Sequence, residues 1–125
     1  MNRSAKQQLG YYYETLACQY LQAKGLVLVT RNSQCALGEI DLIMRDGEYW
    51  VFIEVRYRQT SRFGLAEATV DKYKQRKILL TAISWLHAHS LSIDDVACRF
   101  DIFAVTGNQY NWITNAFGLE IINNG

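Results

Sequence analysis

Three carboxylates and two guanidinium groups lie close together in the sequence, in two runs that a short turn separates. Glu39 and Asp41 stand in the first run, and Glu54, Arg56 and Arg58 stand in the second. Carboxylate oxygens are ligands that Mg²⁺ prefers, usually one or two of them together with waters and a phosphate. Carboxylates that face one another on a sheet repel each other unless a cation lies among them. The residues therefore indicate either a divalent-metal site or a solvated, salt-bridged end of a hairpin, and both interpretations stay open.

A β-hairpin would hold these side chains together. Residues 38–44 and 50–58 are rich in apolar side chains, and the Asp46-Gly47 step between them is typical of a type I′ turn. With Asp46 and Gly47 as the loop, Glu39 faces Glu54 directly. A loop of another length would change these pairs. Because side chains alternate along a strand, one face is wholly apolar and the other carries the charges at its far end. The apolar face holds Ile40, Leu42, Met44, Val51, Ile53 and Val55.

The remaining elements follow from capping signals and from the spacing of apolar residues. Ser4 precedes a long helical pattern that ends before Gly25, and residues 9, 13, 16, 17, 20 and 21 form its predicted core stripe. A polar loop is expected over residues 59–66. The other predicted elements are a strand over 26–31, a helix over 70–89, strands over 96–106 and 110–114, and a short segment over 119–122. The predicted order, α-β-β-β-α-β-β, is that of an α/β fold with a mixed sheet and packed helices.

Composition and charge set limits on the function. The chain has 125 residues, enough for one domain with a real core, so we expect a single domain over residues 1–125. The net charge is only +1, but residues 56–77 contain seven basic and two acidic side chains, which suits a phosphate backbone. The three cysteines lack zinc spacing and predict reduced thiols in the cytoplasm. The N-terminal residues lack the apolar core of a signal peptide, and no apolar run is long enough to span a membrane. We therefore expect no membrane partner.

The motifs resemble those of the YraN-like family of predicted endonucleases. The resemblance extends from about residue 10 to residue 105, and its most specific part is the run Gly38-Glu39-Ile40-Asp41-Leu42-Ile43 followed by Phe52-Ile53-Glu54-Val55. That family is similar to the PD-(D/E)XK nucleases, which have a restriction-endonuclease-like fold, and to archaeal Holliday-junction resolvases. The resemblance therefore implies a metal-dependent DNA endonuclease that hydrolyses phosphodiester bonds, including those of branched DNA.

The resemblance also implies roles for individual residues. Asp41 and Glu54 match the carboxylates that bind Mg²⁺ or Mn²⁺, together with the carbonyl of Val55, and Glu14 matches a helix glutamate beside the metal site. Glu39 belongs to the family motif and joins the candidate metal ligands. Arg56 stands where the family usually has lysine and would stabilise charge in the transition state. The residues expected to follow the DNA backbone are Arg58, Arg62, Lys72, Lys74 and Lys77.

The arginine at position 56 leaves more than one function open. Arginine keeps the positive charge and can hold phosphate, but it stays protonated and cannot act as a base. Arg58, Lys72 or Lys74 could take the place of the lysine, or the metal alone could suffice. The alternatives to an endonuclease are a nucleic-acid-binding protein with weak or no catalysis and a protein-interaction module. A homodimer would suit a cut across two strands, although no residue specifies one.

Overall fold

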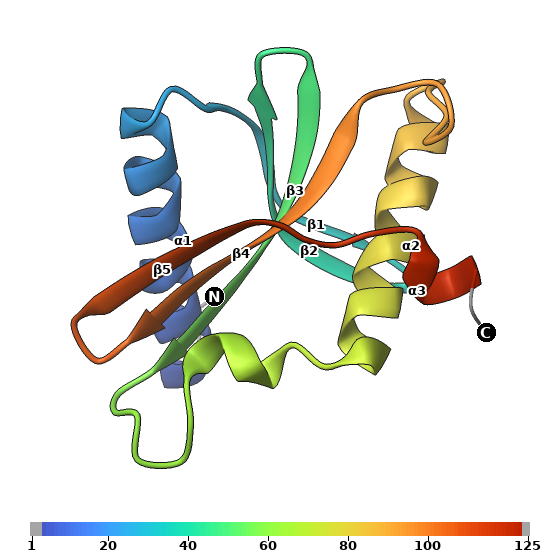
Figure 1. Ribbon diagram of the computed structural model, residues 1–125. Helices are drawn as coiled ribbons and strands as arrows, with labels where there is room; N and C mark the ends of the chain where they lie inside the picture. The colour runs from blue at the N-terminus through green and yellow to red at the C-terminus, as the bar shows by residue number, and fades with distance from the viewer. Residues whose placement is uncertain (1–3, 124–125) are drawn as a thin grey trace.

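A single sheet with helices on both sides organises the chain (Figure 1). The computed structural model describes residues 4–123. The helices are α1 (Ala5–Ala23), the 3₁₀ helix η1 (Ala66–Thr69), α2 (Lys72–Ala88) and the short α3 (Glu120–Asn123). The strands are β1 (Val27–Cys35), β2 (Gly38–Asp46), β3 (Tyr49–Arg58), β4 (Cys98–Thr106) and β5 (Gln109–Phe117).

Local signals in the sequence explain where the helices begin. Ser4 caps α1 through a capping box: its hydroxyl accepts from the Gln7 amide, and the Gln7 side chain accepts from the Ser4 amide. Asp71 caps α2 by accepting from the amide of Lys74. Both helices thus lie where they were predicted, within two residues. The 3₁₀ helix η1 was not predicted, because its four residues are too few to show a periodicity.

The sheet has the strand order β1-β2-β3-β4-β5 and is mixed. Neighbouring strands are antiparallel except for β3 and β4, which are parallel over the full length from Trp50↔Cys98 to Arg58↔Thr106. Parallel neighbours need a crossover, and α2 lies between these two strands in the chain. The predicted element order is therefore confirmed. Two predicted strands were too short, since β1 continues through Asn32 to Cys35 and β5 runs to Phe117.

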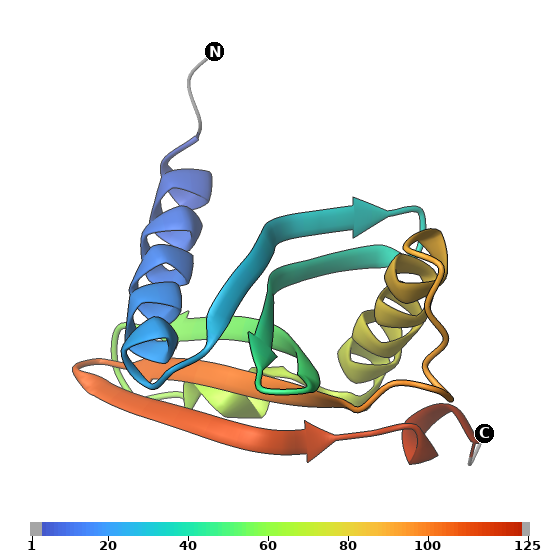
Figure 2. The same ribbon diagram turned by 90° about the horizontal axis from the view of Figure 1, so that it is seen from above.

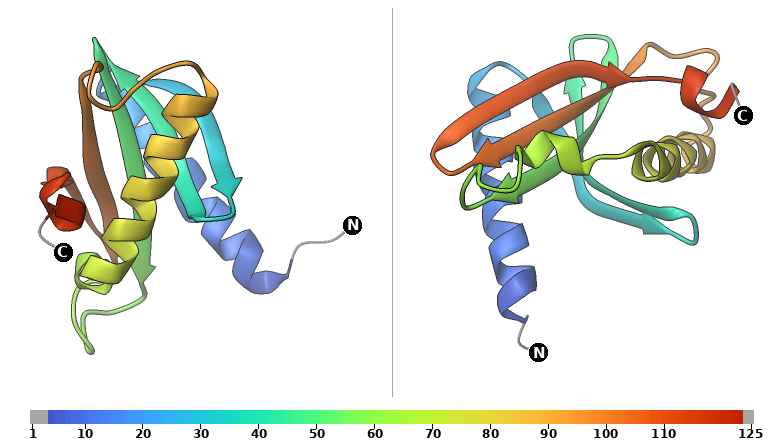
Figure 3. Two further views of the ribbon diagram at one scale, coloured as in Figure 1. Left: turned by 90° about the vertical axis from the view of Figure 1, so that its right-hand side faces the viewer. Right: turned by 60° about the horizontal axis from the view of Figure 1, so that its bottom comes forward.

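Each face of the sheet carries its own hydrophobic core. The core on the α1 side includes Ala17, Cys18, Leu21, Leu42, Met44, Val51, Ile53, Val55, Phe103 and Val105. The core under α2 includes Ile40, Ile43, Phe52, Ile78, Leu79, Ala82, Leu86, Phe100 and Phe117. Burial of α1 begins in its second half, and Leu9 is 41% exposed. The prediction that Leu9 is a core residue was wrong, because the first turns of α1 extend past the sheet (Figure 3).

The register of the central hairpin differs from the prediction by two residues. The pairs are Asp46↔Tyr49, Met44↔Val51 and Leu42↔Ile53, so Gly47 and Glu48 form the loop and Glu39 does not face Glu54 as an ordinary ladder pair. Gly47 has φ +59°, and Glu48 is not among the residues with positive φ. These signs are those of a type II′ turn with glycine first, and the predicted type I′ turn was wrong. A shift of two residues keeps each side chain on its predicted face where β2 and β3 are paired, from Leu42 onward.

The hairpin of β1 and β2 bends away from the rest of the sheet (Figure 2). The pairing of β2 with β3 ends at Leu42, while the pairing of β1 with β2 continues to Cys35↔Gly38. As a result Ile40 packs in the core under α2, although its alternation predicted the opposite face. Residues 38–41 of β2, which precede Leu42, do not pair with β3, so the sheet is open at the position of Asp41.

The architecture is an α/β fold consistent with the restriction-endonuclease-like fold, with the predicted order of elements. Among the residues that the structure describes, no helix has the length and apolar character needed to cross a bilayer.

Candidate active site

Asp41 and Glu54 come together where β2 leaves β3. Oδ2 of Asp41 accepts a hydrogen bond from the backbone amide of Val55 at 2.8 Å, which fixes this carboxylate against β3. Glu54, the preceding residue on β3, is only 4% exposed. The two side chains therefore come from neighbouring strands and lie in one poorly solvated region, as the sequence predicted.

The electrostatics of Asp41 reflect this crowding. Burial and then the negative charge of Glu54 raise the pKa of Asp41 well above its ordinary value, and the charge of Glu39 adds to the rise. The hydrogen bond from the Val55 amide acts in the opposite direction. The pKa of Asp41 is therefore raised first by its burial and then by the neighbouring carboxylates.

Glu14 approaches the same region from α1. Burial raises its pKa first, and the charge of Asp41 raises it further, while a hydrogen bond from Asn32 and the charge of Arg31 lower it. Nη2 of Arg31 lies 3.7 Å from Oε1 of Glu14. The sequence reasoning singled out Glu14 but gave no role to Arg31 or Asn32. No signal in the sequence links them to Glu14, because the contact joins a helix and a strand.

Two cations lie against Glu54. Nη2 of Arg56 is 2.9 Å from Oε2 of Glu54, and Nζ of Lys74 is 3.6 Å from the same oxygen. Arg56 extends from β3 itself, whereas Lys74 reaches in from the first turns of α2. A lysine is thus present at the site, although it comes from the helix instead of from position 56. Lys74 was predicted to be one of the residues that could replace the lysine missing from position 56.

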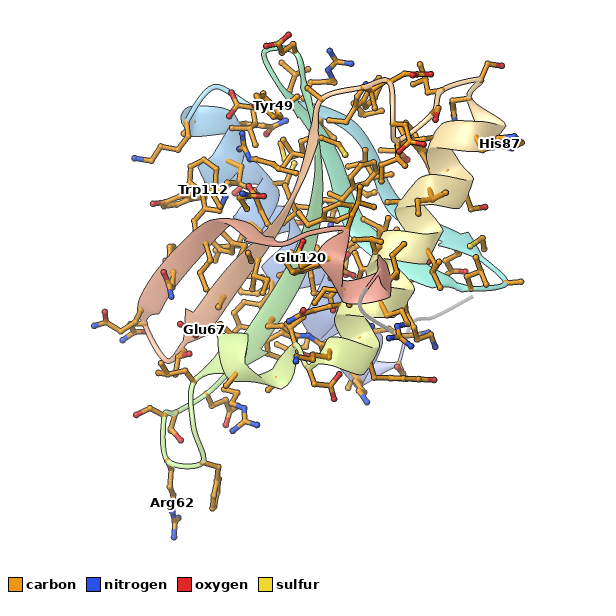
Figure 4. The ribbon with its side chains drawn as sticks, turned by 45° about the vertical axis from the view of Figure 1, so that its right-hand side comes forward. Tyr49, Arg62, Glu67, His87, Trp112 and Glu120 are labelled. Carbon is orange, nitrogen blue, oxygen red and sulfur yellow. The ribbon has the colours of Figure 1, made fainter. Side chains whose placement is uncertain are left out.

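The other basic residues predicted to bind nucleic acid lie around the cluster. Nη1 of Arg58 donates to the carbonyl of Phe63 at 2.6 Å and so holds the base of the loop that follows β3. Arg62 lies at the tip of that loop and points away from the body of the molecule (Figure 4). Lys72 is exposed at the start of α2, and Lys77 lies one turn after Lys74. The structure brings only Lys74 of this predicted set into contact with the carboxylates.

Two open hollows flank Glu39 beside this cluster. The first, of about 360 Å³, is lined by Gln7, Gly10, Tyr11, Glu14, Asn32, Gln34 and Glu39. The second, of about 340 Å³, is lined by Gln34, Cys35, Gly38, Glu39, Lys74, Lys77 and Ile78. Gln34 and Glu39 form the ridge between them, and Nε2 of Gln34 donates to Oε2 of Glu39 at 3.2 Å. Gln34 was not predicted, because the strand was expected to end before it.

The donor set suits a hard divalent cation, but its carboxylates are not gathered around one point. Within residues 4–123, no three or more His, Cys, Asp or Glu side chains converge as a ready-made metal site. Glu54 instead turns its oxygen to Arg56 and Lys74. The oxygen ligands of Asp41 and Glu54 are of the kind that Mg²⁺ and Mn²⁺ take. Burial and the negative charge of Glu54 raise the pKa of Asp41, and a cation bound beside Asp41 would offset both effects.

The fold and the cluster define an α/β protein with an acidic site at the opening of its sheet. Residues 13–105 match the model of the uncharacterised protein family UPF0102. A UPF0102 protein of Enterobacter sp. (strain 638) is 51% identical over 91% of this chain and 87% of its own length. UPF0102 proteins of Pectobacterium carotovorum and Serratia proteamaculans are 46% and 45% identical, over 89% and 93% of this chain and 94% and 99% of their own lengths. The chain therefore belongs to the UPF0102, or YraN-like, family.

Proposed function

We propose that this protein is a metal-dependent endonuclease of the PD-(D/E)XK type that hydrolyses phosphodiester bonds in DNA, including branched DNA. One observation carries the proposal. Acidic side chains of α1, β2 and β3 share one poorly solvated region, where burial and then their mutual repulsion raise the pKa values of Asp41 and Glu14. Perturbed carboxylates of this kind are typical of functional sites, because burying uncompensated charge costs stability.

The residues of the cluster divide the work of such a reaction. Asp41 and Glu54 would hold Mg²⁺ or Mn²⁺, which supplies a Lewis acid for the phosphoryl oxygen and lowers the pKa of a water. Glu14 would orient the attacking water. Glu39, which also contributes to the acidic field, is assigned to the rim because its carboxylate accepts from Gln34.

The cations of the site would stabilise the negative charge that develops on the phosphate. Lys74 lies 3.6 Å from Glu54 and takes the place of the lysine that is missing from position 56. Arg56 cannot act as a base and contributes only its charge and its hydrogen bonds. Lys72 and Lys77 extend the positive charge of Lys74 along α2 and would follow the DNA backbone. Arg58 at the end of β3 and Arg62 at the tip of the following loop would contact the backbone farther from the reacting phosphate.

A second candidate is a nucleic-acid-binding protein that does not cleave. The ion pair of 2.9 Å between Arg56 and Glu54 favours it, because this arginine occupies a carboxylate oxygen that a metal would need. Arg56→Lys would then create cleavage where the native protein shows none.

The test is incubation of the purified protein with labelled linear, flapped and four-way DNA in Mg²⁺ and in Mn²⁺. Glu54→Gln keeps the size of the buried side chain, and Glu48→Gln is the matched control, since Glu48 is an exposed glutamate of the hairpin turn. We expect cleavage by the native protein and by Glu48→Gln, with a loss of at least about a thousandfold in Glu54→Gln. Cleavage that Glu54→Gln retains in full would contradict the proposal. Binding without cleavage in both metals would support the second candidate.

The role of Lys74 has its own test. Lys74→Met should lower the rate of cleavage by about a hundredfold. Lys72→Met, an exposed lysine two residues earlier, should change only the salt-dependent binding of DNA. Equal effects of the two substitutions would show that Lys74 has no part in the reaction.

A further inference from the structure

The first hollow lies between two walls that do not belong to the core. One wall is the first half of α1, where Gln7, Gly10, Tyr11 and Glu14 line the hollow. Their spacing of three, four and seven residues places them on one face of the helix. That face would bury apolar residues in an ordinary amphipathic helix, but here it is polar, and the residues of α1 that pack against the core begin at Tyr13. The right-hand view of Figure 3 shows this half of α1 projecting beside the hairpin of β1 and β2.

The opposite wall comes from β1 and β2. Asn32 has φ +52°, a left-handed conformation inside a strand that asparagine tolerates better than most residues. Asn32 hydrogen-bonds to Glu14 across the hollow, and Gln34 hydrogen-bonds to Glu39 beside it. Non-glycine residues in this conformation gather at functional sites, because the surrounding structure must maintain the strain.

The lining chemistry of the two hollows differs in a way that separates two parts of a nucleotide. The first hollow has three carboxamides, one tyrosine and two carboxylates. Arg31 borders it, but this guanidinium lies 4.1 Å from the centre of the Tyr11 ring and 3.7 Å from Glu14, so its charge is already paired and it covers one face of the tyrosine. The second hollow has Lys74 and Lys77. An anionic phosphate therefore suits the second hollow better than the first. A neutral planar group with amino donors suits the first, because glutamine, asparagine and acidic side chains pair with the edges of bases.

We propose that the first hollow binds the base of a nucleotide next to the reacting phosphate, and that it selects bases with an exocyclic amino group, such as adenine and cytosine, over thymine, which has none. This inference rests on the proposed function. The base must leave its duplex partner to enter the hollow, so the substrate at this position is unpaired. The nucleic-acid chain passes over the ridge of Gln34 and Glu39, with its base on the side of α1 and its phosphate on the side of Lys74 and Lys77.

Gly10 provides a way to close the hollow. A Cβ atom at Gly10 would meet nothing within 4 Å, and its φ does not lie in the left-handed region. Gly10→Leu should therefore fold and place its side chain in the space that the base would occupy. Gln19→Leu is the matched control, because it puts a leucine on an exposed position of the same helix outside the hollow.

The experiment measures binding of labelled single-stranded octanucleotides that differ only at one central position, which is adenine, cytosine, thymine or an abasic site. Binding is measured in EDTA at fixed salt by fluorescence anisotropy, so that it does not depend on cleavage. We expect adenine and cytosine to bind about tenfold more tightly than thymine or the abasic site. Gly10→Leu should remove this preference, and Gln19→Leu should retain it.

A second variant covers a failure of Gly10→Leu to fold. Gln34→Met keeps the length of the side chain but removes the carboxamide, so it should also abolish the preference. Equal binding of all four strands by the native protein would overturn the inference, as would a preference that survives both substitutions. Cleavage in Mg²⁺ is measured separately on the same strands. Base preference without cleavage would contradict the proposed endonuclease but support the base site. Cleavage without base preference would support the endonuclease but contradict the base site.

Discussion

Two buried carboxylate sites lie on the central strands of this sheet, and they differ in how far the surrounding groups compensate their negative charge. Asp101 on β4 is fully buried beside Ile53 of β3. It accepts from Nε of Arg99 at 3.2 Å, from Nε1 of Trp112 at 3.0 Å and from the amide of Asn115 at 2.9 Å. Asp41, a short distance across the sheet, has the amide of Val55 but also faces the negative charge of Glu54.

The difference separates a structural carboxylate from a functional one. The ring of donors around Asp101 compensates its charge, and Arg99 extends the network to Asp46 at 2.9 Å, which ties β4 to the hairpin turn. Asp41 and Glu14 have the opposite balance, because burial and then the negative charges of neighbouring carboxylates raise their pKa values. A bound divalent cation would supply the compensation that the chain itself does not.

The largest effect on stability is expected at the compensated site. Asp101→Asn leaves donors of Arg99 and its neighbours without an acceptor in the interior, so the free energy of unfolding should fall by about 3 kcal/mol. Urea denaturation measures this loss. The control is Asp46→Asn, which removes the other, 43% exposed partner of Arg99 and should cost less than about 1 kcal/mol. Similar losses from the two substitutions would contradict the distinction between the sites.

A substitution at Asp41 is expected to raise the free energy of unfolding instead of lowering it. Its pKa in the folded chain lies above the ordinary value of 3.8, so in the pH range just above that value the folded state keeps a proton that the unfolded state has lost. The free energy of unfolding therefore falls as pH rises through this window. Asp41→Asn does not titrate and should be more stable than the native protein at neutral pH, with no advantage below pH 3.8.

Urea denaturation of Asp41→Asn and the native protein in EDTA, from acid to neutral pH, measures this effect. An Asp41→Asn protein that is less stable than the native chain at neutral pH would show that the charge of Asp41 is compensated. The same variant should not cleave DNA, because the amide cannot replace a carboxylate as a metal ligand.

A smaller gain in stability is expected from the substitution of Glu14. Its pKa is also raised, but the hydrogen bond from Asn32 and the charge of Arg31 at 3.7 Å already relieve part of the repulsion. Glu14→Gln should therefore stabilise the protein at neutral pH by less than Asp41→Asn does. Thermal unfolding in EDTA ranks the two variants, and a larger gain for Glu14→Gln would reverse the assignment of Asp41 as the centre of the repulsion.

The sequence predicted much of this arrangement, for reasons that particular residues make clear. The predicted hairpin had the wrong loop residues, yet Asp41 and Glu54 still came together, because a register shift of two preserves the faces of both strands. The predicted cap at Ser4 placed α1 closely, and the spacing of apolar residues placed α2 within two residues, although its cap at Asp71 was not predicted. The element order then followed from the spacing of apolar residues.

The parts that sequence reasoning missed depend on contacts between distant segments. The bend of β1 and β2 moves Ile40 to the opposite core, and periodicity along one strand carries no information about such a bend. The first turns of α1 are free of the sheet, so Leu9 is exposed although its spacing fits the core stripe. The approach of Arg31 to Glu14 joins a strand to a helix 17 positions earlier, and no local pattern in the sequence links the two residues.

The measurement that tests the central claim most directly is the thermal unfolding of the native protein and of Asp41→Asn, each in EDTA and in Mn²⁺ at neutral pH. Binding of a cation to the folded state alone stabilises it by about 2.7 kcal/mol when the metal is at a hundred times its dissociation constant. The account predicts that Mn²⁺ raises the midpoint of the native protein by several degrees and leaves that of Asp41→Asn nearly unchanged. An absence of any shift in the native protein, or an equal shift in both proteins, would contradict the claim that this carboxylate group binds a divalent cation.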